Sequence, residues 1–297
     1  MSRVNANGLV IEFESFGSDE AEPILLISGL GVQMTRWSAP FCEALASRGY
    51  RVIRFDNRDV GLSTHLDGAS VPDLSAMTRA LGRGERPPTP YGLLDMASDA
   101  IGLLDALDVE RAHVVGRSMG GMIAQLMAVE QSDRVLSLTS IMSSTGAPNL
   151  PGPSPEAMAT LTRRGPRPMD DEAGYLDHSV AAARVIASPG FPFDERAQRE
   201  RALAEVKRAY DPAGFARQLA AMITAGDRRA GLNTITAPTL VIHGAADVLI
   251  PLAGGQDTAA NIPGAELVVI EGMGHDLPSE LHQRFVQAII INARRRR

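Results

Sequence analysis

The chain has only one cysteine, Cys42, among its 297 residues. A single thiol excludes an internal disulfide and any metal site built on several cysteines, and its place in an apolar helical pattern predicts a buried, inert side chain. No apolar run reaches the roughly 18 residues that a membrane-spanning helix needs, and residues 1–8 lack the character of a signal peptide. We therefore expect a cytoplasmic protein without membrane insertion.

An excess of basic charge is also lacking. The 29 lysines and arginines face 35 aspartates and glutamates, so the formal net charge is −6. Proteins that bind nucleic acid generally carry a basic surface. We therefore expect no nucleic acid as a partner. With 22% charged and 44% hydrophobic residues, the composition is that of an ordinary globular protein.

Short apolar runs alternate with helical patterns along most of the chain. This alternation predicts an α/β fold, in which helices cover both faces of a mostly parallel sheet. A hairpin is expected around residues 5–8 because Asn7-Gly8 is a favoured two-residue turn. Strands are expected at residues 24–27, 51–55, 113–116, 135–141, 238–243 and 266–270, and the continuous apolar run at 24–27 predicts a strand buried on both faces. Helices are expected at residues 39–48, 91–107 and 251–261. Two more are expected, one directly after the motif around Ser118 that is described below and one at the end of the chain.

The pattern changes between residues 146 and 230, where proline-punctuated, charged helical segments show no buried strand. We interpret residues 146–230 as a helical cap or lid that is inserted in a core made of residues 1–145 and 231–297. Residues 67–90, rich in glycine and proline, are expected to make an excursion near the site with a short helix at 74–81.

The residues around Ser118 carry the strongest functional signal. Gly116-Arg117-Ser118-Met119-Gly120 matches the G-x-S-x-G nucleophile elbow, in which a serine sits on a strained turn between a strand and a helix. Glycines are needed there because backbone passes close to both flanking positions. The apolar strand before the motif and the helical pattern after it favour this interpretation.

A serine nucleophile needs a base, and the base needs an orienting acid. The expected chain order is serine, acid, histidine. His275 follows the last predicted strand directly, whereas His282 falls inside a polar helix and is expected to be solvated. Asp247 follows the strand at 238–243, and residues 142–150 offer no carboxylate as a rival. We therefore predict that Ser118, Asp247 and His275 form a catalytic triad.

The reaction also needs backbone N–H groups that stabilise a negatively charged oxygen. Met119, which follows the nucleophile at the start of a helix, is predicted to donate one N–H group. Leu30, in the turn Ser28-Gly29-Leu30-Gly31, is predicted to donate the other. A simple tight connection is the alternative interpretation of that turn.

Apolar, flexible side chains lie near these residues in the sequence. They indicate an adaptable pocket for the substrate, with an ordinary place in the core as the alternative. The pocket candidates are Met34, Trp37, Met122 and Met142, together with Met119.

These residues and motifs resemble the α/β-hydrolase superfamily over residues 9–143 and 232–292. The loop at residues 56–63 is similar to the family's aspartate-x-arginine-x-x-glycine-x-serine loop, and Asp247 and His275 fall where the family has its acid and base. The resemblance is closest to small bacterial esterases of the aclacinomycin methylesterase and enol-lactonase type. It implies an eight-stranded sheet, an acyl-enzyme mechanism on small to medium apolar esters, and no cofactor or metal.

Two positions depart from the family pattern. The oxyanion turn begins Ser28-Gly29 instead of His-Gly, which changes how that loop is anchored. Arg117 stands before the nucleophile, where histidine or another modest side chain is common. Its guanidinium stays charged at any working pH, so Arg117 is either a structural or solvent-facing cation or a cation on the substrate side.

Other functions fit less well. Gly29-Leu30-Gly31 is similar to a dinucleotide-binding turn, but Met34 replaces the third glycine. Gly116 and Gly121 have phosphate-loop spacing without the required lysine and serine or threonine. A ligand receptor without catalysis remains an alternative, as do lactone hydrolysis, carbon–carbon bond hydrolysis and perhydrolysis with the same triad. The partner expected is a small-molecule ester, and the sequence leaves the oligomeric state open.

Overall fold

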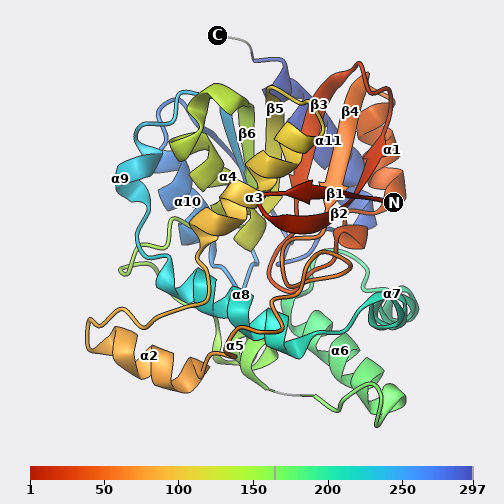
Figure 1. The fold of residues 1–297 in the computed structure, drawn as a ribbon, viewed down its shortest axis with the longest axis vertical. Helices are drawn as coiled ribbons and strands as arrows, with labels where there is room; N and C mark the ends of the chain where they lie inside the picture. Colours follow the sequence, from red (N-terminus) through yellow and green to blue (C-terminus); the bar gives the residue numbers. More distant parts are fainter. Residues whose placement is uncertain (164, 296–297) are drawn as a thin grey trace.

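A computed structural model describes residues 1–163 and 165–295. The strands of this part of the chain are β1 (Ser2–Ala6), β2 (Leu9–Phe16), β3 (Glu22–Ile27), β4 (Tyr50–Phe55), β5 (Ala112–Arg117), β6 (Val135–Ile141), β7 (Thr239–Gly244) and β8 (Glu266–Ile270). They form one eight-stranded sheet in the order β1-β2-β4-β3-β5-β6-β7-β8 (Figure 1). β1 and β2 pair antiparallel, and β2 is antiparallel to β4, whereas β4, β3 and β5 to β8 all pair in parallel. The predicted α/β class with a mostly parallel sheet is confirmed.

Helices connect these strands. The α-helices are α1 (Ala39–Ala46), α2 (Leu74–Gly82), α3 (Leu93–Ala106), α4 (Met119–Glu130), α5 (Pro155–Thr162), α6 (Glu172–Ile186), α7 (Glu195–Arg208), α8 (Pro212–Thr224), α9 (Arg229–Leu232), α10 (Leu252–Ala260) and α11 (His282–Ala293). Short 3-10 helices are η1 (Met34–Arg36), η2 (Ser132–Arg134) and η3 (Ser279–Leu281). The helices expected at 39–48, 74–81, 91–107 and 251–261 are therefore present, with ends that shift by at most two residues.

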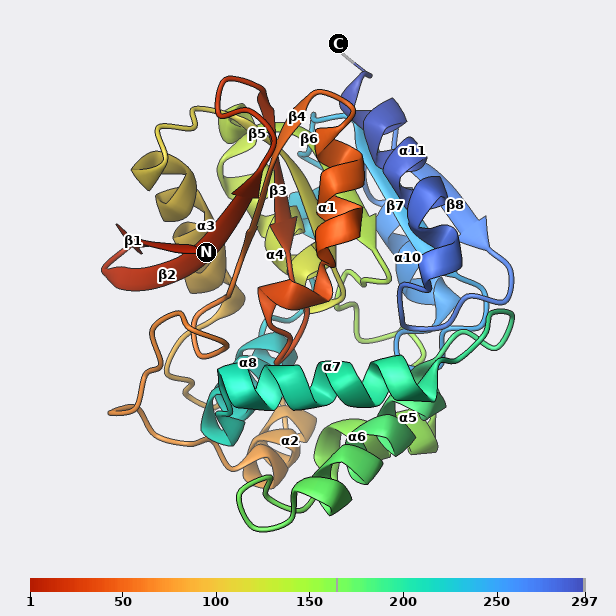
Figure 2. The ribbon, with the colours of Figure 1, turned by 90° about the vertical axis from the view of Figure 1, so that its right-hand side faces the viewer.

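Strand β3 shows why the sheet is covered on both faces. Its side chains alternate, so Ile24 and Leu26 join the apolar cluster that contains α1 and α11, and Leu25 and Ile27 join the cluster that contains α3 and α4. In Figure 2, α1 and α11 lie in front of the sheet and α3 lies behind it. Cys42 of α1 is buried as expected, and burial raises the pKa of its thiol to about 12.

The N-terminal hairpin has the predicted turn. Asn7 and Gly8 both have positive φ, 49° and 76°, which is the geometry of the two-residue turn that matches the twist of a hairpin. The hairpin places β2 beside β4 at one side of the sheet. The candidate site residues described below follow the carboxyl ends of the parallel strands β5, β7 and β8.

The segment between β6 and β7 holds α5 to α9, and its described residues contain no strand. We call residues 146–230 the cap segment. Figure 1 shows α5, α6, α7 and α8 together beyond one end of the sheet, whereas α9 contacts α4. The helix α2, which belongs to the earlier part of the chain, packs against α8.

Buried ion pairs join the cap segment to the loop after β4. The guanidinium of Arg217 in α8 contacts Asp59 at 2.7 Å, and Arg208 in α7 contacts Asp56 at 2.6 Å. The side chains of Arg217 and Asp59 are 1% and 0% exposed. A charge buried this deeply is tolerated only when it is paired, so these contacts fix the cap segment on the core.

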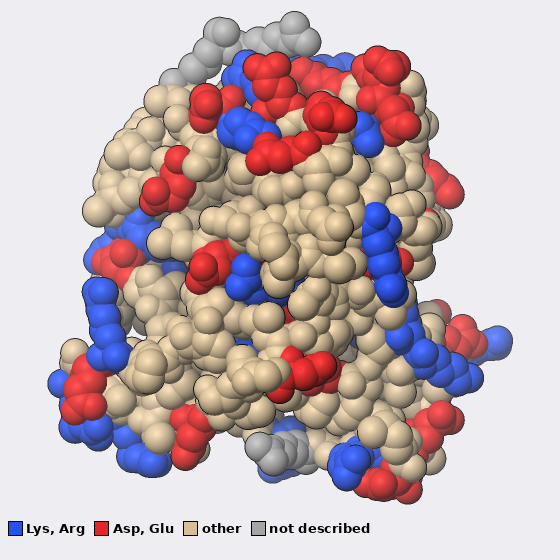
Figure 3. Space-filling view, in the orientation of Figure 1, with Lys and Arg blue, Asp and Glu red and all other residues tan. Residues whose placement is uncertain are grey.

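Among the described residues, none of the helices has the length and apolar character to cross a membrane. The face shown in Figure 3 carries acidic and basic side chains interspersed, with acidic ones gathered at its upper edge.

Candidate active site

Ser118 lies on the turn between β5 and α4 with φ 55° and ψ −124°, a backbone conformation that non-glycine residues rarely adopt. The flanking glycines make this turn possible. A β-carbon at Gly116 would lie 2.1 Å from the carbonyl oxygen of Gly120, and one at Gly120 would lie 2.3 Å from that of Ile27. The turn is fixed by the amide of Ser118, which donates to the carbonyl of Ile141 at 2.9 Å.

The structure brings His275 and Asp247 to this serine. His275 Nε2 lies 3.0 Å from Ser118 Oγ, and His275 Nδ1 lies 2.7 Å from Asp247 Oδ2. The three side chains come from the ends of β5, β7 and β8, which are separated along the chain but share one edge of the sheet. Nucleophile and base are within hydrogen-bond reach, and so are base and acid.

Asp247 is held in place by backbone amides. Its Oδ1 accepts hydrogen bonds from the N–H groups of Leu249 and Ile250, both at 2.9 Å, which leaves Oδ2 to accept from the imidazole. With the Nδ1 proton directed to Asp247, the Nε2 lone pair faces the serine hydroxyl. The arrangement can therefore move a proton from Ser118 to His275.

The predicted oxyanion donors belong to two backbone segments close to the serine. Met119 is the first residue of α4, so its N–H group has no acceptor within the helix. A β-carbon built on Gly29 would lie 3.3 Å from Ser118 Cβ and 3.7 Å from Ser118 Oγ. Leu30 follows Gly29 directly, so its amide starts from a backbone that is already beside the serine.

The turn that bears Leu30 is anchored by residues that sequence reasoning missed. Gln218 of α8 accepts a hydrogen bond from the Gly31 amide at 2.8 Å, and Asn57 donates to the Ser28 carbonyl at 3.1 Å. Gly31 and Gln218 are 187 residues apart, so no local pattern could have linked them. The cap segment and the loop after β4 therefore hold this turn, which begins with Ser28 instead of the family's histidine.

The pocket candidates are all buried, but they belong to different parts of the core. Met122 packs in the cluster with α3 and α4, whereas Trp37 and Met142 pack in the cluster with α1 and α11. Met34 is fully buried, and its amide donates to Asp56 at 2.7 Å. Their role in binding an acyl group stays a prediction.

Two polar side chains near the site contact aromatic rings. The guanidinium of Arg117 lies over the ring of Trp37, 5.2 Å from its centroid. His282 is half-buried and packs edge-on against Phe41 at 5.3 Å, and burial lowers the pKa of its imidazole. The expectation that His282 is simply solvated is wrong, because α11 begins at this residue and faces α1.

The loop that bears His275 is clamped by the cap segment. The His275 amide donates to the carbonyl of Ile186, and the Gly274 amide donates to Ser188 Oγ, both at 2.8 Å. The Ser188 hydroxyl donates in turn to the carboxylate of Asp276. Burial raises the pKa of Asp276, and the hydrogen bonds from Ser188 act against that rise. The position of the imidazole therefore depends on the link between α6 and α7.

We expect Ser188→Ala to lower the free energy of unfolding by about 1–3 kcal/mol, because it leaves the buried Gly274 amide without its acceptor and removes the hydroxyl donor of Asp276, which keeps only the backbone amide of residue 188. We also expect kcat for an ester substrate to fall, because the loop of His275 loosens. Urea unfolding and steady-state kinetics measure both. Ser98→Ala, at an exposed helix position, is the matched control, and equal behaviour of the two variants would contradict the clamp.

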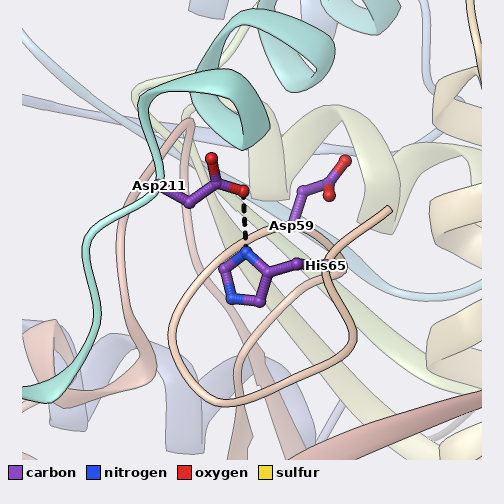
Figure 4. Close-up of side chains that lie close together, drawn as sticks. All are labelled: Asp59, His65 and Asp211. Atoms are coloured by element: carbon purple, nitrogen blue, oxygen red, sulfur yellow. Dashed lines mark hydrogen bonds and ion pairs between the residues drawn. The ribbon is translucent and has the colours of Figure 1, made fainter. Parts of the chain in front are cut away.

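A second group of polar side chains, Asp59, His65 and Asp211, lies between the loop after β4 and α8 (Figure 4). His65 Nδ1 lies 2.7 Å from Asp211 Oδ2, and its Nε2 lies 3.0 Å from the Gly61 carbonyl. Arg217 donates to both oxygens of Asp59, at 2.7 and 2.8 Å. The cationic partner of these carboxylates is thus a guanidinium, and the group is best explained as an ion-pair network that joins the core to the cap segment.

This network predicts a pH dependence of stability. Burial acts to lower the pKa of His65, but the contacts with Asp211 and Gly61 outweigh it and leave the pKa raised. A raised pKa means that the contribution to stability is fully present below about pH 6.5 and is lost as the pH rises through the folded-state value. Urea unfolding measured from pH 6 to pH 9 should show this loss, and His65→Gln should remove it. If the free energy of unfolding falls with pH as steeply in His65→Gln as in the control His178→Gln, the role of His65 is contradicted.

Comparisons with known proteins agree with this geometry. Residues 22–280 match the family model described as alpha/beta hydrolase fold. The chain belongs to the alpha/beta hydrolase fold family. The expected resemblance to small bacterial esterases and enol-lactonases is confirmed, because both types occur among the relatives found.

Two curated relatives and one solved structure show how far this likeness extends. The rhodomycin D methylesterase DnrP of Streptomyces peucetius is 31% identical, over 95% of this hydrolase-family chain and 94% of its own. The 3-oxoadipate enol-lactonase 2 of Acinetobacter baylyi is 26% identical, over 96% and 94%. A meta-cleavage product hydrolase from Pseudomonas fluorescens IP01 superposes with a TM-score of 0.75 at 21% identity, covering 98% and 97%, and supports the fold.

Proposed function

We propose that this protein is a serine carboxylic ester hydrolase that acts on small to medium, mainly apolar esters through an acyl-enzyme. The observation that carries the proposal is the continuous hydrogen-bonded chain from Ser118 Oγ through His275 to Asp247, with distances of 3.0 and 2.7 Å. The family membership and a methylesterase relative that covers almost the whole chain support it.

The first half of the reaction acylates the serine. His275 Nε2 takes the hydroxyl proton as Ser118 Oγ attacks the ester carbonyl carbon, and the carbonyl oxygen becomes an anion held by the N–H groups of Leu30 and Met119. When the tetrahedral intermediate collapses, the bond to the alcohol oxygen breaks. His275 gives its proton to the departing alcohol, and the acyl group stays on the serine.

The second half releases the acid. His275 takes a proton from a water molecule, which attacks the acyl carbon and regenerates the oxyanion. Collapse breaks the bond to Ser118 Oγ, and His275 returns the proton to the serine. Asp247 keeps the imidazole oriented in both halves, because its own position is fixed by two backbone amides. The proposed chemistry uses no cofactor and no metal.

The cap segment is proposed to act as a lid that shapes the acyl pocket, with Met34, Trp37, Met122 and Met142 as its apolar candidates from the core. It contributes Gln218 to the turn of Leu30 and Ser188 to the loop of His275, so it touches both halves of the site. The cytoplasmic location and the lack of a nucleic-acid partner stay predictions from the sequence.

The proposal predicts both turnover and covalent labelling. We expect hydrolysis of p-nitrophenyl butyrate with a rapid first burst, and labelling of one serine per chain by a fluorophosphonate probe. Peptide mass spectrometry should place the label on Ser118. A folded protein that neither turns over the ester nor takes up the label would contradict the proposal and favour a ligand receptor on the same fold.

A further inference from the structure

The guanidinium of Arg117 lies next to the proposed nucleophile without an acceptor. Among the described residues, no carboxylate, carbonyl or hydroxyl accepts a hydrogen bond from it, and its Nε is buried and unpartnered. The guanidinium carbon lies over the face of the Trp37 ring. A guanidinium offers five N–H donors; the Nε–H of Arg117 is buried, whereas the terminal N–H groups of this partly exposed side chain reach solvent. Arg117 therefore presents N–H donors that no described residue accepts and that an acceptor from outside the chain can reach.

A second orphaned donor lies at the same place. Trp37 is 1% exposed, and within the described chain its indole Nε1 also has no hydrogen-bond acceptor. The guanidinium carbon of Arg117 lies over the indole ring, so the two unpartnered nitrogens belong to side chains that contact one another. Buried polar groups in proteins are nearly always paired, and two exceptions side by side indicate a place for an acceptor group.

The charges around Arg117 indicate that this acceptor is an anion. Arg36 and Arg201 repel its charge, whereas Glu205 and Asp276 attract it. Glu205 is already engaged by Arg36, with both oxygens accepting, at 2.5 and 2.7 Å. Arg201 is also attracted by Asp276 and by Asp194, and among the described residues Arg117 forms no salt bridge of its own. Burial, with the two neighbouring arginines, lowers the pKa of Arg117 to about 9, so it is still charged at neutral pH.

We propose that Arg117 binds a carboxylate that the substrate carries close to its ester group. The inference rests on the proposed function and narrows its substrate class to otherwise apolar esters with one negative charge. Arg117 directly precedes Ser118, and Trp37 lies on the connection between β3 and α1 that also bears Leu30. The proposal therefore places the bound carboxylate close to the residues that would hold the reacting carbonyl group.

The carboxylate can sit on the acyl part or on the alcohol part of such an ester, and two pairs of substrates separate the cases. Monomethyl glutarate is compared with dimethyl glutarate, and O-acetylglycolate is compared with its methyl ester. We expect kcat/KM to favour the anionic member of one pair by about tenfold or more, which is the scale of a hydrogen bond to a charged group. Equal rates, or a preference for the neutral ester, in both pairs would overturn the proposal.

A charge-removing variant tests whether Arg117 causes the preference. Arg117→Gln should reduce the ratio of kcat/KM for the charged and the neutral ester by about tenfold, mainly through a higher KM for the charged ester. Arg196→Gln removes one positive charge from an exposed pair on the same helix as Arg201 and is the matched control. A ratio that falls equally in both variants would show a long-range charge effect and contradict a site at Arg117.

Binding of glutarate to the wild type tests the site without any mutation or turnover. We expect glutarate to compete with p-nitrophenyl butyrate, and isothermal titration to show binding that glutaramide does not match. Loss of ester hydrolysis with glutarate binding intact would defeat the proposed function and keep the anion site. Ester hydrolysis without glutarate competition or binding would defeat the anion site and keep the proposed function.

Discussion

Ser118→Ala is expected to lower kcat for p-nitrophenyl butyrate by about 10⁴-fold or more. The variant removes the only oxygen that His275 Nε2 can deprotonate at 3.0 Å, so no acyl-enzyme can form. The proposed oxyanion donors at Leu30 and Met119 are backbone groups that the substitution leaves unchanged, and residual turnover is expected to reflect water attack within the site. Steady-state kinetics with active-site titration measure the loss, and the fluorophosphonate label should disappear with it.

The fold of this variant is expected to survive. The alanine keeps the β-carbon of Ser118, and the hydrogen bonds of the elbow come from the backbone amide and carbonyl of residue 118. Thermal unfolding should therefore give a midpoint close to that of the wild type. Ser98→Ala, at an exposed helix position, should keep full activity. Activity above one-hundredth of the wild-type value in a pure Ser118→Ala sample would overturn the assignment of the nucleophile.

Arg217→Met is expected to lower the free energy of unfolding by about 3–5 kcal/mol, because it leaves the carboxylate of Asp59 buried without its ion-pair partner. Natural domains are stable by about 5–15 kcal/mol, so this is a large share of the total. The methionine fills similar space, so the loss reports the missing charge more than a cavity. Urea unfolding of the purified variant measures it.

The same substitution is expected to reduce catalysis in the molecules that stay folded. Arg217 fixes α8 on the core, and the next residue, Gln218, holds the Gly31 amide beside the predicted oxyanion donor Leu30. Arg196→Met breaks an exposed pair on α7 and is the control, with no change expected in the unfolding midpoint or in kcat. A fully stable Arg217→Met would contradict the anchoring role of the buried pair.

The parts of the site that sequence reasoning predicted are those with a local signature. The strand, turn and helix around Ser118 follow from an apolar run, two glycines at required positions and a helical pattern, all within about 15 residues of sequence. Asp247 and His275 lie in the loops that follow the parallel strands β7 and β8, and parallel strands end at the same edge of a sheet. Their meeting at hydrogen-bond distance therefore follows from strand order and strand direction.

The contacts that support the site have no such signature. Ser188 and Gln218 are ordinary polar residues in helical surroundings, and they act on loops that are 86 and 187 residues away in the chain. Periodicity predicts that a side chain is buried or exposed, but it does not select the partner of a polar group. The partly buried position of His282 against Phe41 was missed for the same reason.

The sequence by itself determined the fold class, the alternation of strands and helices and the order of Ser118, Asp247 and His275, because these depend on local backbone preferences and on the burial of apolar runs. Only the tertiary structure decided how the cap segment is anchored, which groups hold the loops of Leu30 and His275, and that Arg117 lies on Trp37 without an acceptor. Such pairings depend on the packing of distant elements, where one of many possible partners comes within hydrogen-bond distance.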